Sequence, residues 1–356
     1  MALDVRDGRA ERLEDRDVVI SVDRLWKVYD PGEQEAREAL ARGEALEDTS
    51  AALRDVSLDV RRGELLVVMG LSGSGKSTLV RCLNGLVAPT AGKARVLDVE
   101  LPDDGAAGLR RLRPRVGMIF QSFGLLPHRT VLSNVAFGLE LRKLSARERD
   151  ERAAQTLELV GLSGREDSYP EELSGGQQQR VGLARALTLD PDILLMDEPF
   201  SALDALIRED LRREILELQE RLHKTIVLIT HDLADAVALA DRIAVVHDGR
   251  LLQVGTPAEI CFAPAHELIE RFVQHVDRLS VVRVEQAVDS QTTDRPVVRV
   301  PASAPLGEAV RMLGESDVPA LLAVDTDGHG VGVVTASSVM RAMSAPLGAK
   351  STEEPT

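Results

Sequence analysis

Stretches of apolar residues alternate with amphipathic stretches along most of this chain. Residues 18–30, VVISVDRLWKVYD, predict a strand and its exit, and residues 51–60, AALRDVSLDV, predict a second strand. The next run, ELLVVMG at 64–70, is apolar enough for a strand buried on both faces. Three later apolar runs predict strands with helices between them: DILLMDEP at 192–199, TIVLITHD at 225–232 and RIAVVHDGRLLQVG at 242–255. This alternation predicts a mainly parallel α/β sheet.

Helical periodicity replaces the strand pattern in two places. It dominates from about residue 130 to residue 190. A shorter stretch at 31–50, PGEQEAREALARGEALEDTS, is rich in Ala, Glu and Arg. It predicts a short helical insertion between two strands.

Beyond residue 276 the pattern becomes that of a second, smaller unit. A polar connection, DSQTTD at 289–294, precedes a pattern of strand, helix, strand, turn, strand and helix. We therefore expect a small α+β module at 280–345. The two chain ends, residues 1–17 and 346–356, lack periodicity and predict disordered tails.

Composition narrows the class of protein. The 356 residues suffice for one large domain and a smaller one. A formal net charge of -15 argues against a sequence-blind nucleic-acid binder, which needs a basic face, so no nucleic-acid partner is expected. Cys82 and Cys261 are too few and too far apart for a disulfide framework, which favours a reducing compartment. No apolar run reaches the roughly 18 residues of a membrane span, and the first residues lack the apolar core of a secretion signal, so we expect a cytoplasmic location.

The strongest local motif is MGLSGSGKST at 69–78, which ends one strand pattern and opens a helical one. It fits G-x-x-x-x-G-K-[ST], a loop whose amides wrap a β-phosphate, whose lysine faces the β/γ oxygens and whose hydroxyl binds Mg²⁺. A flexible glycine turn is the alternative, but the strand before and the helix after favour a nucleoside triphosphate site. The predicted nucleotide-binding residues of this loop are Gly70, Ser72, Gly73, Ser74, Gly75, Lys76, Ser77 and Thr78.

Two further apolar strands deliver polar side chains to their ends. One ends in Asp197, which can hold Mg²⁺, and in Glu198, which can face the γ-phosphate and polarise an attacking water. The other ends in His231. A lone histidine is more often structural. Ligands of open α/β sheets bind at the carboxyl ends of the strands, however, so we predict a γ-phosphate contact for His231.

A second anion site is predicted within EELSGGQQQRVGLARAL at 171–187. From Gln177 onward the stretch has helical spacing, and Ser174 is placed to cap that helix. Gly175 and Gly176 leave the first amide groups of the helix uncovered, which suits an anion. A glycine turn before a buried helix is the alternative.

Together these motifs resemble the ATP-binding-cassette (ABC) ATPases, across about residues 18–260. The resemblance implies a P-loop ABC ATPase domain at 18–276 with a parallel core sheet, an antiparallel β subdomain and a helical subdomain at about 122–190. It also implies that the chain hydrolyses ATP and that ATP and Mg²⁺ are its cofactors.

The resemblance further implies roles for individual residues. Tyr29 matches the aromatic residue that stacks on adenine, whereas the nearby Trp26 is out of phase for that task and is expected to pack. Gln121, within MIFQSFGLLPHRTV, matches the glutamine that senses Mg²⁺ and the water. The implied catalytic residues are Glu198, His231, Gln121 and Lys76. The implied Mg²⁺ ligands are Ser77, Gln121 and Asp197.

Two cassettes of this family meet head to tail, so that the LSGGQ segment of each closes over the ATP of the other. A second copy of the chain is therefore an implied partner, because a single copy holds only half of each site. The implied contacts to the ATP of the partner are Ser174, Gly175, Gly176, Gln177 and Asp204, the last of which ends the SALD segment.

Within the family, the insertion at 31–50, GLSGSGKSTLVRCLNGL, FQSFGLLPHRTV and PDILLMDEPFSALD resemble the ATPase subunits of glycine betaine/proline betaine importers. This implies a motor at the cytoplasmic face of the membrane, with integral membrane permease subunits as partners and, indirectly, an extracytoplasmic substrate-binding protein. The helical region after Gln121, with exposed apolar residues from FGLLP, is expected to receive the permease. The module at 280–345 resembles a single CBS repeat, in which Ser338 replaces the acid that often holds a ribose. A purely structural appendage is the alternative for this module.

Three other functions compete with this interpretation. A soluble ABC ATPase of translation or DNA repair typically has two cassettes or a long coiled-coil insertion, and this sequence has neither. A cassette that no longer hydrolyses ATP is disfavoured because Lys76, Gln121, Glu198 and His231 are intact. An importer of a different solute is the third, because this sequence does not distinguish betaine, choline and carnitine as the transported solute.

Overall fold

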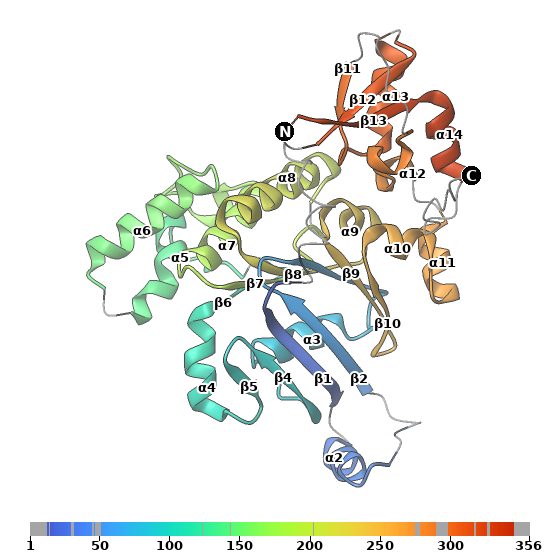
Figure 1. Cartoon of the computed structure of the whole chain (residues 1–356). Coiled ribbons are helices and arrows are strands. Elements are labelled where there is room, and N and C mark those ends of the chain that lie inside the picture. The colour runs from blue at the N-terminus through green and yellow to red at the C-terminus, as the bar shows by residue number, and fades with distance from the viewer. Residues whose placement is uncertain are drawn as a thin grey trace. The chain divides into compact units, whose positions relative to one another are not determined.

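The computed structural model describes residues 13, 15–29, 32–44, 46, 51–122, 124–142, 144–201, 203–274, 278–289, 298–316, 318–325 and 328–344. The predicted tail at 346–356, most of the predicted tail at 1–17 and most of the connection at 289–294 lie outside these residues. The described residues form two compact units (Figure 1). The larger unit comprises residues 15–239 and 244–252, and the smaller one comprises Leu13, residues 240–243 and the described residues from 253 onward. The domain limits of 18–276 and 280–345 remain predictions.

A six-stranded sheet forms the centre of the larger unit. Its strand order is β10-β9-β3-β8-β7-β6, and β3, β8, β7 and β6 pair in parallel. The bounds are β3 Leu65–Met69, β6 Val116–Ile119, β7 Ile193–Asp197, β8 Thr225–Thr230, β9 Arg242–His247 and β10 Arg250–Gly255. Every residue of β3, β7 and β8 is buried, which agrees with their uniformly apolar sequences. The prediction of a mainly parallel α/β sheet is confirmed.

The register of this sheet brings three strand ends to one edge. Met69 pairs with Thr230, and Asp197 pairs with Ile229. The residues that follow β3, β7 and β8 therefore begin at nearly the same height. This alignment places the glycine-rich loop, Glu198 and His231 at a common edge of the sheet.

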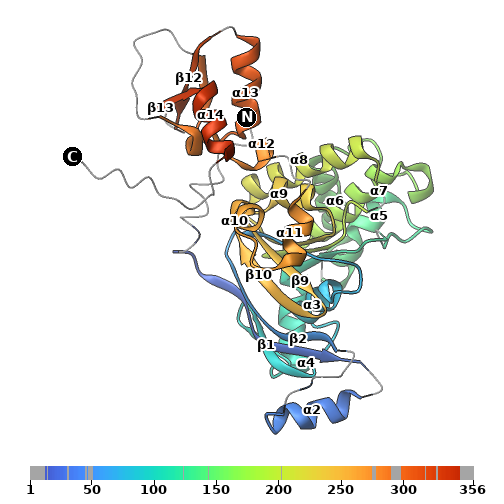
Figure 2. The ribbon, with the colours of Figure 1, turned by 90° about the vertical axis from the view of Figure 1, so that its right-hand side faces the viewer.

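A second sheet, in the order β2-β1-β4-β5, pairs entirely antiparallel. Its strands are β1 Val18–Val28, β2 Ala51–Arg61, β4 Ala91–Val96 and β5 Val99–Leu101. Helix α2, Glu33–Ala41, lies within the predicted insertion and near the end of the β1–β2 pair (Figure 2). Trp26 packs beside a small buried cluster of Val28, Ala36 and Ala51, which is the packing role expected of it.

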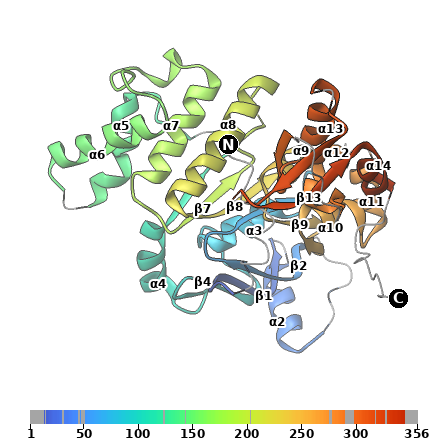
Figure 3. The ribbon, with the colours of Figure 1, turned by 45° about the horizontal axis from the view of Figure 1, so that its top comes forward.

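Helices of the larger unit connect and cover these strands. They are α3 Lys76–Leu83, α4 Gly105–Leu112, α5 Val131–Ala136, α6 Ala146–Leu159, α7 Gly175–Leu187, α8 Ala205–Leu222 and α9 Leu233–Leu239. Three short 3-10 helices accompany them: η1 Arg113–Arg115, η2 Phe137–Leu141 and η3 Pro170–Glu172. Helices α5, α6 and α7 pack against one another as a separate helical group (Figure 3). This group occupies the region where helical periodicity dominates the sequence.

The smaller unit contains a three-stranded sheet in the order β11-β12-β13. β11 and β12 are parallel, and β12 and β13 are antiparallel. Its elements are α10 Pro257–Phe262, α11 Glu267–Val273, α12 Arg278–Val281, η4 Val284–Ala287, β11 Val298–Pro301, α13 Leu306–Glu315, β12 Ala320–Val324, β13 Gly330–Thr335 and α14 Ala336–Ser344. A buried apolar cluster that includes Val300, Leu306, Leu321 and Val334 forms its core. From β11 onward the elements follow the predicted order.

None of the helices that the structure describes combines the length and the apolar character needed to cross a membrane. The longest, α8, carries charged residues along its whole length.

Candidate functional site

The glycine-rich loop joins the end of β3 to the start of α3, and two of its glycines cannot be replaced without displacement of backbone. A Cβ on Gly70, which has a φ of +153°, would come within 2.0 Å of the carbonyl oxygen of Val246. A Cβ on Gly75, with a φ of +101°, would come within 2.1 Å of the carbonyl oxygen of Ala52. The loop is thus held tightly against two neighbouring segments, and its shape depends on these glycines.

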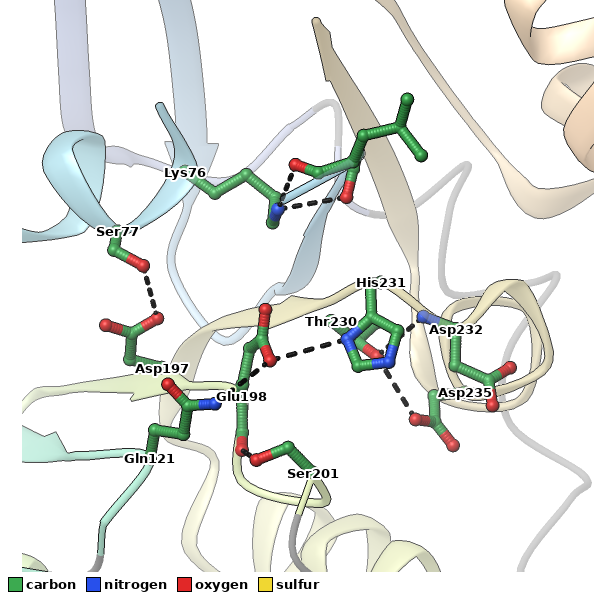
Figure 4. A network of polar contacts seen from close by, with 12 residues as sticks. Lys76, Ser77, Gln121, Asp197, Glu198, Ser201, Thr230, His231, Asp232 and Asp235 are labelled. Atoms are coloured by element: carbon green, nitrogen blue, oxygen red, sulfur yellow. Dashed lines mark hydrogen bonds and ion pairs between the residues drawn. The ribbon is translucent and has the colours of Figure 1, made fainter. Parts of the chain in front are cut away.

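Lys76 opens α3 and turns its ammonium group back into the loop. The side chain is buried, and Nζ donates hydrogen bonds to the carbonyl oxygens of Gly70, at 2.9 Å, and Leu71, at 2.8 Å (Figure 4). Burial lowers the pKa of Lys76, while the nearby carboxylates of Glu198 and Asp197 oppose that shift. A positive charge is therefore concentrated inside the curve of the loop, as the binding of phosphate oxygens requires.

Ser77 and Asp197 form a pair of oxygen donors beside the loop. The Ser77 hydroxyl donates a 2.8 Å hydrogen bond to Asp197 Oδ1, and Asp197 is only 5% exposed. Among the described residues, no three His, Cys, Asp or Glu side chains gather into a metal site. A hydroxyl beside a carboxylate instead fits Mg²⁺, because this ion takes only one or two protein ligands and fills its other positions with water and with phosphate oxygens of a bound nucleotide. Sequence reasoning missed Arg81, whose Nη2 lies 3.8 Å from Asp197 Oδ2.

Two of the predicted catalytic side chains converge on one atom of a third, Oε2 of Glu198. His231 Nδ1 lies 3.3 Å from it and Gln121 Nε2 lies 3.5 Å from it (Figure 4). The Glu198 side chain is largely buried, whereas that of His231 is half exposed. Glu198 also has a positive φ of 48°, a conformation that is uncommon for a residue other than glycine and that clusters at functional sites. The carboxylate is thus held by two neighbours and aimed toward the loop.

The segment that carries His231 is anchored by a network that the sequence did not predict. Thr230 Oγ1 donates to Asp235 Oδ2 at 3.1 Å and accepts from the amide of Asp232 at 3.0 Å. Two arginines of α8 reach this segment: Arg208 pairs with Asp232 at 2.7 Å, and Arg212 pairs with Asp235 at 2.7 Å. Burial is the main cause that raises the pKa of Asp235. The i, i+4 spacing of the two arginines on one helix is the only sequence signal for these contacts.

The second predicted anion site lies at the first turn of α7. Ser174 caps the helix by accepting from the amide of Gln177 at 3.3 Å, and Gln177 Oε1 accepts from the amide of Ser174 at 3.0 Å. The helix begins at Gly175, which confirms Ser174 as its cap and adds the two glycines to the helical spacing seen from Gln177 onward. This capping box fixes both glycines in the first turn with their amides toward the helix entrance.

The start of α8 lies against the start of α7. Asp204 caps α8 by accepting from the amide of Ile207 at 3.0 Å. A Cβ on Gly176 would come within 2.6 Å of Ile207 Cγ2, so the two helices approach closely because residue 176 is glycine. Within the described part of the chain, neither Ser174 nor Asp204 bonds to the residues of the network in Figure 4.

Tyr29 follows β1 directly and is 44% exposed. Its hydroxyl lies 3.4 Å from Oγ1 of Thr78, in the first turn of α3. The ring thus lies beside the helix that carries Lys76 and Ser77. An aromatic surface next to a phosphate-binding loop is suited to stacking on a base.

The two leucines of FGLLP are less exposed than the sequence predicts. Leu125 and Leu126 are half-buried, and the backbone amide and carbonyl of Leu126 are both bonded to the Asn134 side chain of α5. Phe123 lies outside the described residues. Leu141, at 90% exposure, and Phe137, at 41%, are exposed apolar side chains of η2, between α5 and α6.

Comparison with known protein families gives two matches. The ABC transporter family matches residues 53–201. The CBS domain family matches residues 290–345.

The chain is also similar to characterised whole proteins. It is 40% identical over 342 residues to the glycine betaine transport ATP-binding protein OpuAA of Bacillus subtilis (strain 168), which spans 94% of this chain and 80% of that protein. It is 51% identical over 270 residues to the trimethylamine N-oxide transport system ATP-binding protein TmoW of Ruegeria pomeroyi, which spans 74% of this chain and 79% of that protein. Among solved structures it resembles the dimeric ATP-binding cassette MJ0796 in a post-hydrolysis state bound to ADP and Pi, with a TM-score of 0.57, 32% identity and coverage of 67% of this chain and 98% of that one.

Proposed function

This chain belongs to the ATP-binding subunits of glycine betaine/proline betaine ABC transporters, and on that premise we propose that it powers the uptake of a quaternary amine osmolyte by hydrolysing ATP. The observation that carries this proposal is the convergence of Gln121 and His231 on Glu198, beside the loop of Lys76. A fixed acid next to a phosphate-binding loop is the arrangement that water attack on a γ-phosphate needs.

Each side chain of the site has a part in the proposed reaction. The loop amides and Lys76 bind the phosphates, and Tyr29 stacks on adenine. Glu198 Oε2 orients the attacking water and accepts its proton, while His231 holds the carboxylate and contacts the γ-phosphate. Ser77 and Asp197, with Gln121, would hold Mg²⁺, which neutralises charge on the transferred phosphoryl group.

A second copy of the chain completes each site in this proposal. Ser174, Gly175, Gly176 and Gln177 would meet the γ-phosphate bound by the partner, with Asp204 at the interface between the copies. The close approach of the α7 and α8 starts supports this, because it presents a helix entrance and the SALD segment side by side. The dimeric state of the solved relative also supports it.

The transported solute is proposed by chemical class. One relative serves glycine betaine and another serves trimethylamine N-oxide. Both solutes carry a nitrogen with four substituents and at least one oxygen acceptor. We take glycine betaine as the first candidate, because that similarity extends over 94% of this chain.

At the cytoplasmic face of the membrane, the permease subunits would be driven by the ATP hydrolysis of this chain. An extracytoplasmic binding protein would deliver the solute to them. The helical group α5–α7 is the proposed docking region, with Leu141 and Phe137 of η2 in place of the half-buried leucines of FGLLP. Gln121 would transmit the state of the nucleotide to this region. We therefore expect Gln121→Ala to reduce transport more than ATP binding, and unchanged transport would contradict this role.

We propose that the smaller unit has a regulatory role that does not involve binding of a nucleotide ribose. Ser338 stands where such modules carry an acid, and its hydroxyl is used locally. It accepts from the amide of Thr335 at 2.9 Å and donates to the carbonyl of the same residue at 3.1 Å. These bonds start α14 and leave the hydroxyl directed into its own turn.

The deciding experiment measures uptake of labelled glycine betaine and labelled trimethylamine N-oxide at high osmolarity. Cells that lack other carriers would express the chain with its permease, either unchanged, as Lys76→Ala, or as the surface control Lys93→Ala. Uptake that requires Lys76 but not Lys93 supports the proposal and selects the solute. ATPase activity without uptake of either solute would contradict the solute class and favour a soluble ATPase or an importer of another solute.

A further inference from the structure

A buried lysine lies beneath the ring of Tyr29. Lys27, on β1, is only 5% exposed, and its Nζ lies 5.0 Å from the centroid of the Tyr29 ring. The same ammonium donates a 2.8 Å hydrogen bond to Oε1 of Glu33, the first residue of the insertion helix α2. Ring, cation and carboxylate thus form a continuous chain of contacts from the insertion to the edge of the nucleotide site.

We propose that Glu33, acting through Lys27, holds the Tyr29 ring in place and thereby strengthens the stacking of the nucleotide base on that ring. This inference rests on the stacking role proposed above for Tyr29. It assigns Lys27 and Glu33 as positioning residues, and it gives the insertion helix α2 a task in nucleotide binding.

Glu33 is itself held firmly, which a positioning residue requires. Its Oε1 accepts from Thr90 Oγ1 at 3.1 Å as well as from Lys27. Thr90 in turn is tied to the backbone of β1, because its Oγ1 accepts from the Val28 amide at 3.0 Å. The hydrogen bond from Lys27 is the main cause that lowers the pKa of Glu33. The carboxylate is therefore charged at neutral pH and tied to the same strand that leads to Tyr29.

The Tyr29 ring is fixed at its other end by the phosphate-binding helix. Its hydroxyl lies 3.4 Å from Thr78 Oγ1, and Thr78 follows Lys76 and Ser77 in the first turn of α3. One face of the ring meets the Lys27 ammonium, and 44% of the side chain remains exposed. The exposed surface is what an adenine would cover.

The position of the cation has a direct chemical consequence. An ammonium over one face of an aromatic ring is attracted by the ring quadrupole, and the attraction is stronger when the ion is desolvated. Lys27 is desolvated, and its charge is balanced by Glu33. The ammonium draws electron density of the ring toward itself, which reduces repulsion between the opposite face and the π-electrons of a stacked purine.

Helix α2 depends on Glu33 because it has little other packing. Within α2, all of which the structure describes, Ala36 is the one buried side chain. It joins Val28 and Ala51 in a small cluster. The bond from Glu33 to Lys27 is thus a major attachment of this helix, so movement of the helix and placement of the Tyr29 ring are coupled.

The test compares ligands with and without a base. Dissociation constants for ATP and for inorganic tripolyphosphate would be measured for the full chain and for Glu33→Gln, Lys27→Met and Tyr29→Ala. The matched control is Glu35→Gln, which removes the same charge from an exposed position in the same helix turn. We expect Glu33→Gln and Lys27→Met to weaken ATP binding about three- to tenfold while tripolyphosphate binding and the kcat for ATP hydrolysis are retained. Glu33→Gln should add nothing in the Tyr29→Ala background.

Three results would overturn the inference, and each rejects a different part of it. Normal ATP binding by Glu33→Gln and Lys27→Met, with weak binding by Tyr29→Ala, would reject the positioning role and leave the stacking role intact. Normal ATP binding by Tyr29→Ala would reject the stacking role itself. Equal loss of ATP and tripolyphosphate binding, with a lower melting temperature, would assign the Lys27–Glu33 pair to stability alone.

Discussion

The Ser77 hydroxyl donates a 2.8 Å hydrogen bond to the carboxylate of Asp197, although the two residues are 120 positions apart in the chain. The contact follows from the parallel order of the sheet, in which β8 lies between β3 and β7 and aligns their carboxyl ends. Two oxygen donors from different motifs are therefore in place beside the phosphate loop. In the proposed site, metal binding would therefore depend on the fold rather than on either motif alone.

Removal of the Asp197 charge should weaken the binding of Mg²⁺ at the nucleotide site. We expect Asp197→Asn to raise the Mg²⁺ concentration that half-saturates ATP hydrolysis by roughly tenfold or more, because a carboxylate is a stronger ligand for a hard cation than an amide. The measurement is the ATPase rate across a Mg²⁺ titration. The control is Asp190→Asn, whose exposed carboxylate pairs with Lys224 on the surface. An unchanged midpoint for Asp197→Asn would remove this residue from the metal site.

Glu198→Gln should abolish turnover and retain binding. The amide keeps the shape of the side chain but cannot accept a proton, so we expect hydrolysis to fall by about 10²-fold or more. The rate of phosphate release and the elution of the ATP-bound protein in gel filtration measure the two effects. We expect the ATP-bound variant to accumulate as a dimer. Hydrolysis close to the normal rate would show that another group accepts the proton.

Two adjacent glycines should respond differently to alanine. A Cβ on Gly176 would come within 2.6 Å of Ile207 Cγ2, whereas a Cβ on Gly175 would lie 3.6 Å from Leu203 Cδ2, an ordinary contact. We expect Gly176→Ala to lower the free energy of unfolding by about 1–3 kcal/mol through overpacking of α7 against α8.

Gly175→Ala serves as the matched control for this effect. We expect it to leave stability nearly unchanged and to reduce ATPase activity, because the added methyl group lies at the entrance of α7. Urea unfolding and steady-state hydrolysis measure the two quantities. Equal stability of the two variants would contradict the packing argument. Normal hydrolysis by Gly175→Ala would contradict the proposed contact with the partner's ATP.

The two thiols should be inert in the folded chain. Burial raises the pKa of Cys82 to about 12 and that of Cys261 to about 11, from an ordinary value of 9.0. Because the thiolate is the reactive species, we expect negligible alkylation by iodoacetamide near pH 8 until denaturant is added. The unfolded chain loses these protons at lower pH than the folded one, so stability should decline as the pH rises above about 9. Mass spectrometry of native and unfolded samples tests the first expectation, and rapid native labelling of either thiol would contradict it.

The sequence predicted the elements of the core well because its signals are local. The motif around Lys76 needs only a strand, a loop and a helix in succession, and the apolar run before Asp197 is legible without knowledge of its neighbours. The strand ends then meet because parallel pairing aligns them. Sequence reasoning could therefore list the residues of the site before their distances were known.

The contacts that sequence reasoning missed are those between distant segments with no shared motif. Arg208 reaches Asp232, and Lys27 reaches both a ring and the first residue of an insertion, but each residue alone matches an ordinary charged surface position. The bonds between the Leu126 backbone and the Asn134 side chain were missed for a similar reason. Such partners are fixed by register and by the packing of helices, which short sequence patterns do not encode.

The separation of Lys76 and Ser174 within one chain has a consequence for how mutant alleles behave together in one cell. In the proposed dimer each composite site takes its phosphate loop from one copy and its capping serine from the other. An allele defective in Lys76 and an allele defective in Ser174 should therefore complement each other, because one of the two sites in a mixed dimer retains both residues. An allele with both defects should instead be dominant, because each mixed dimer that it forms has no intact site.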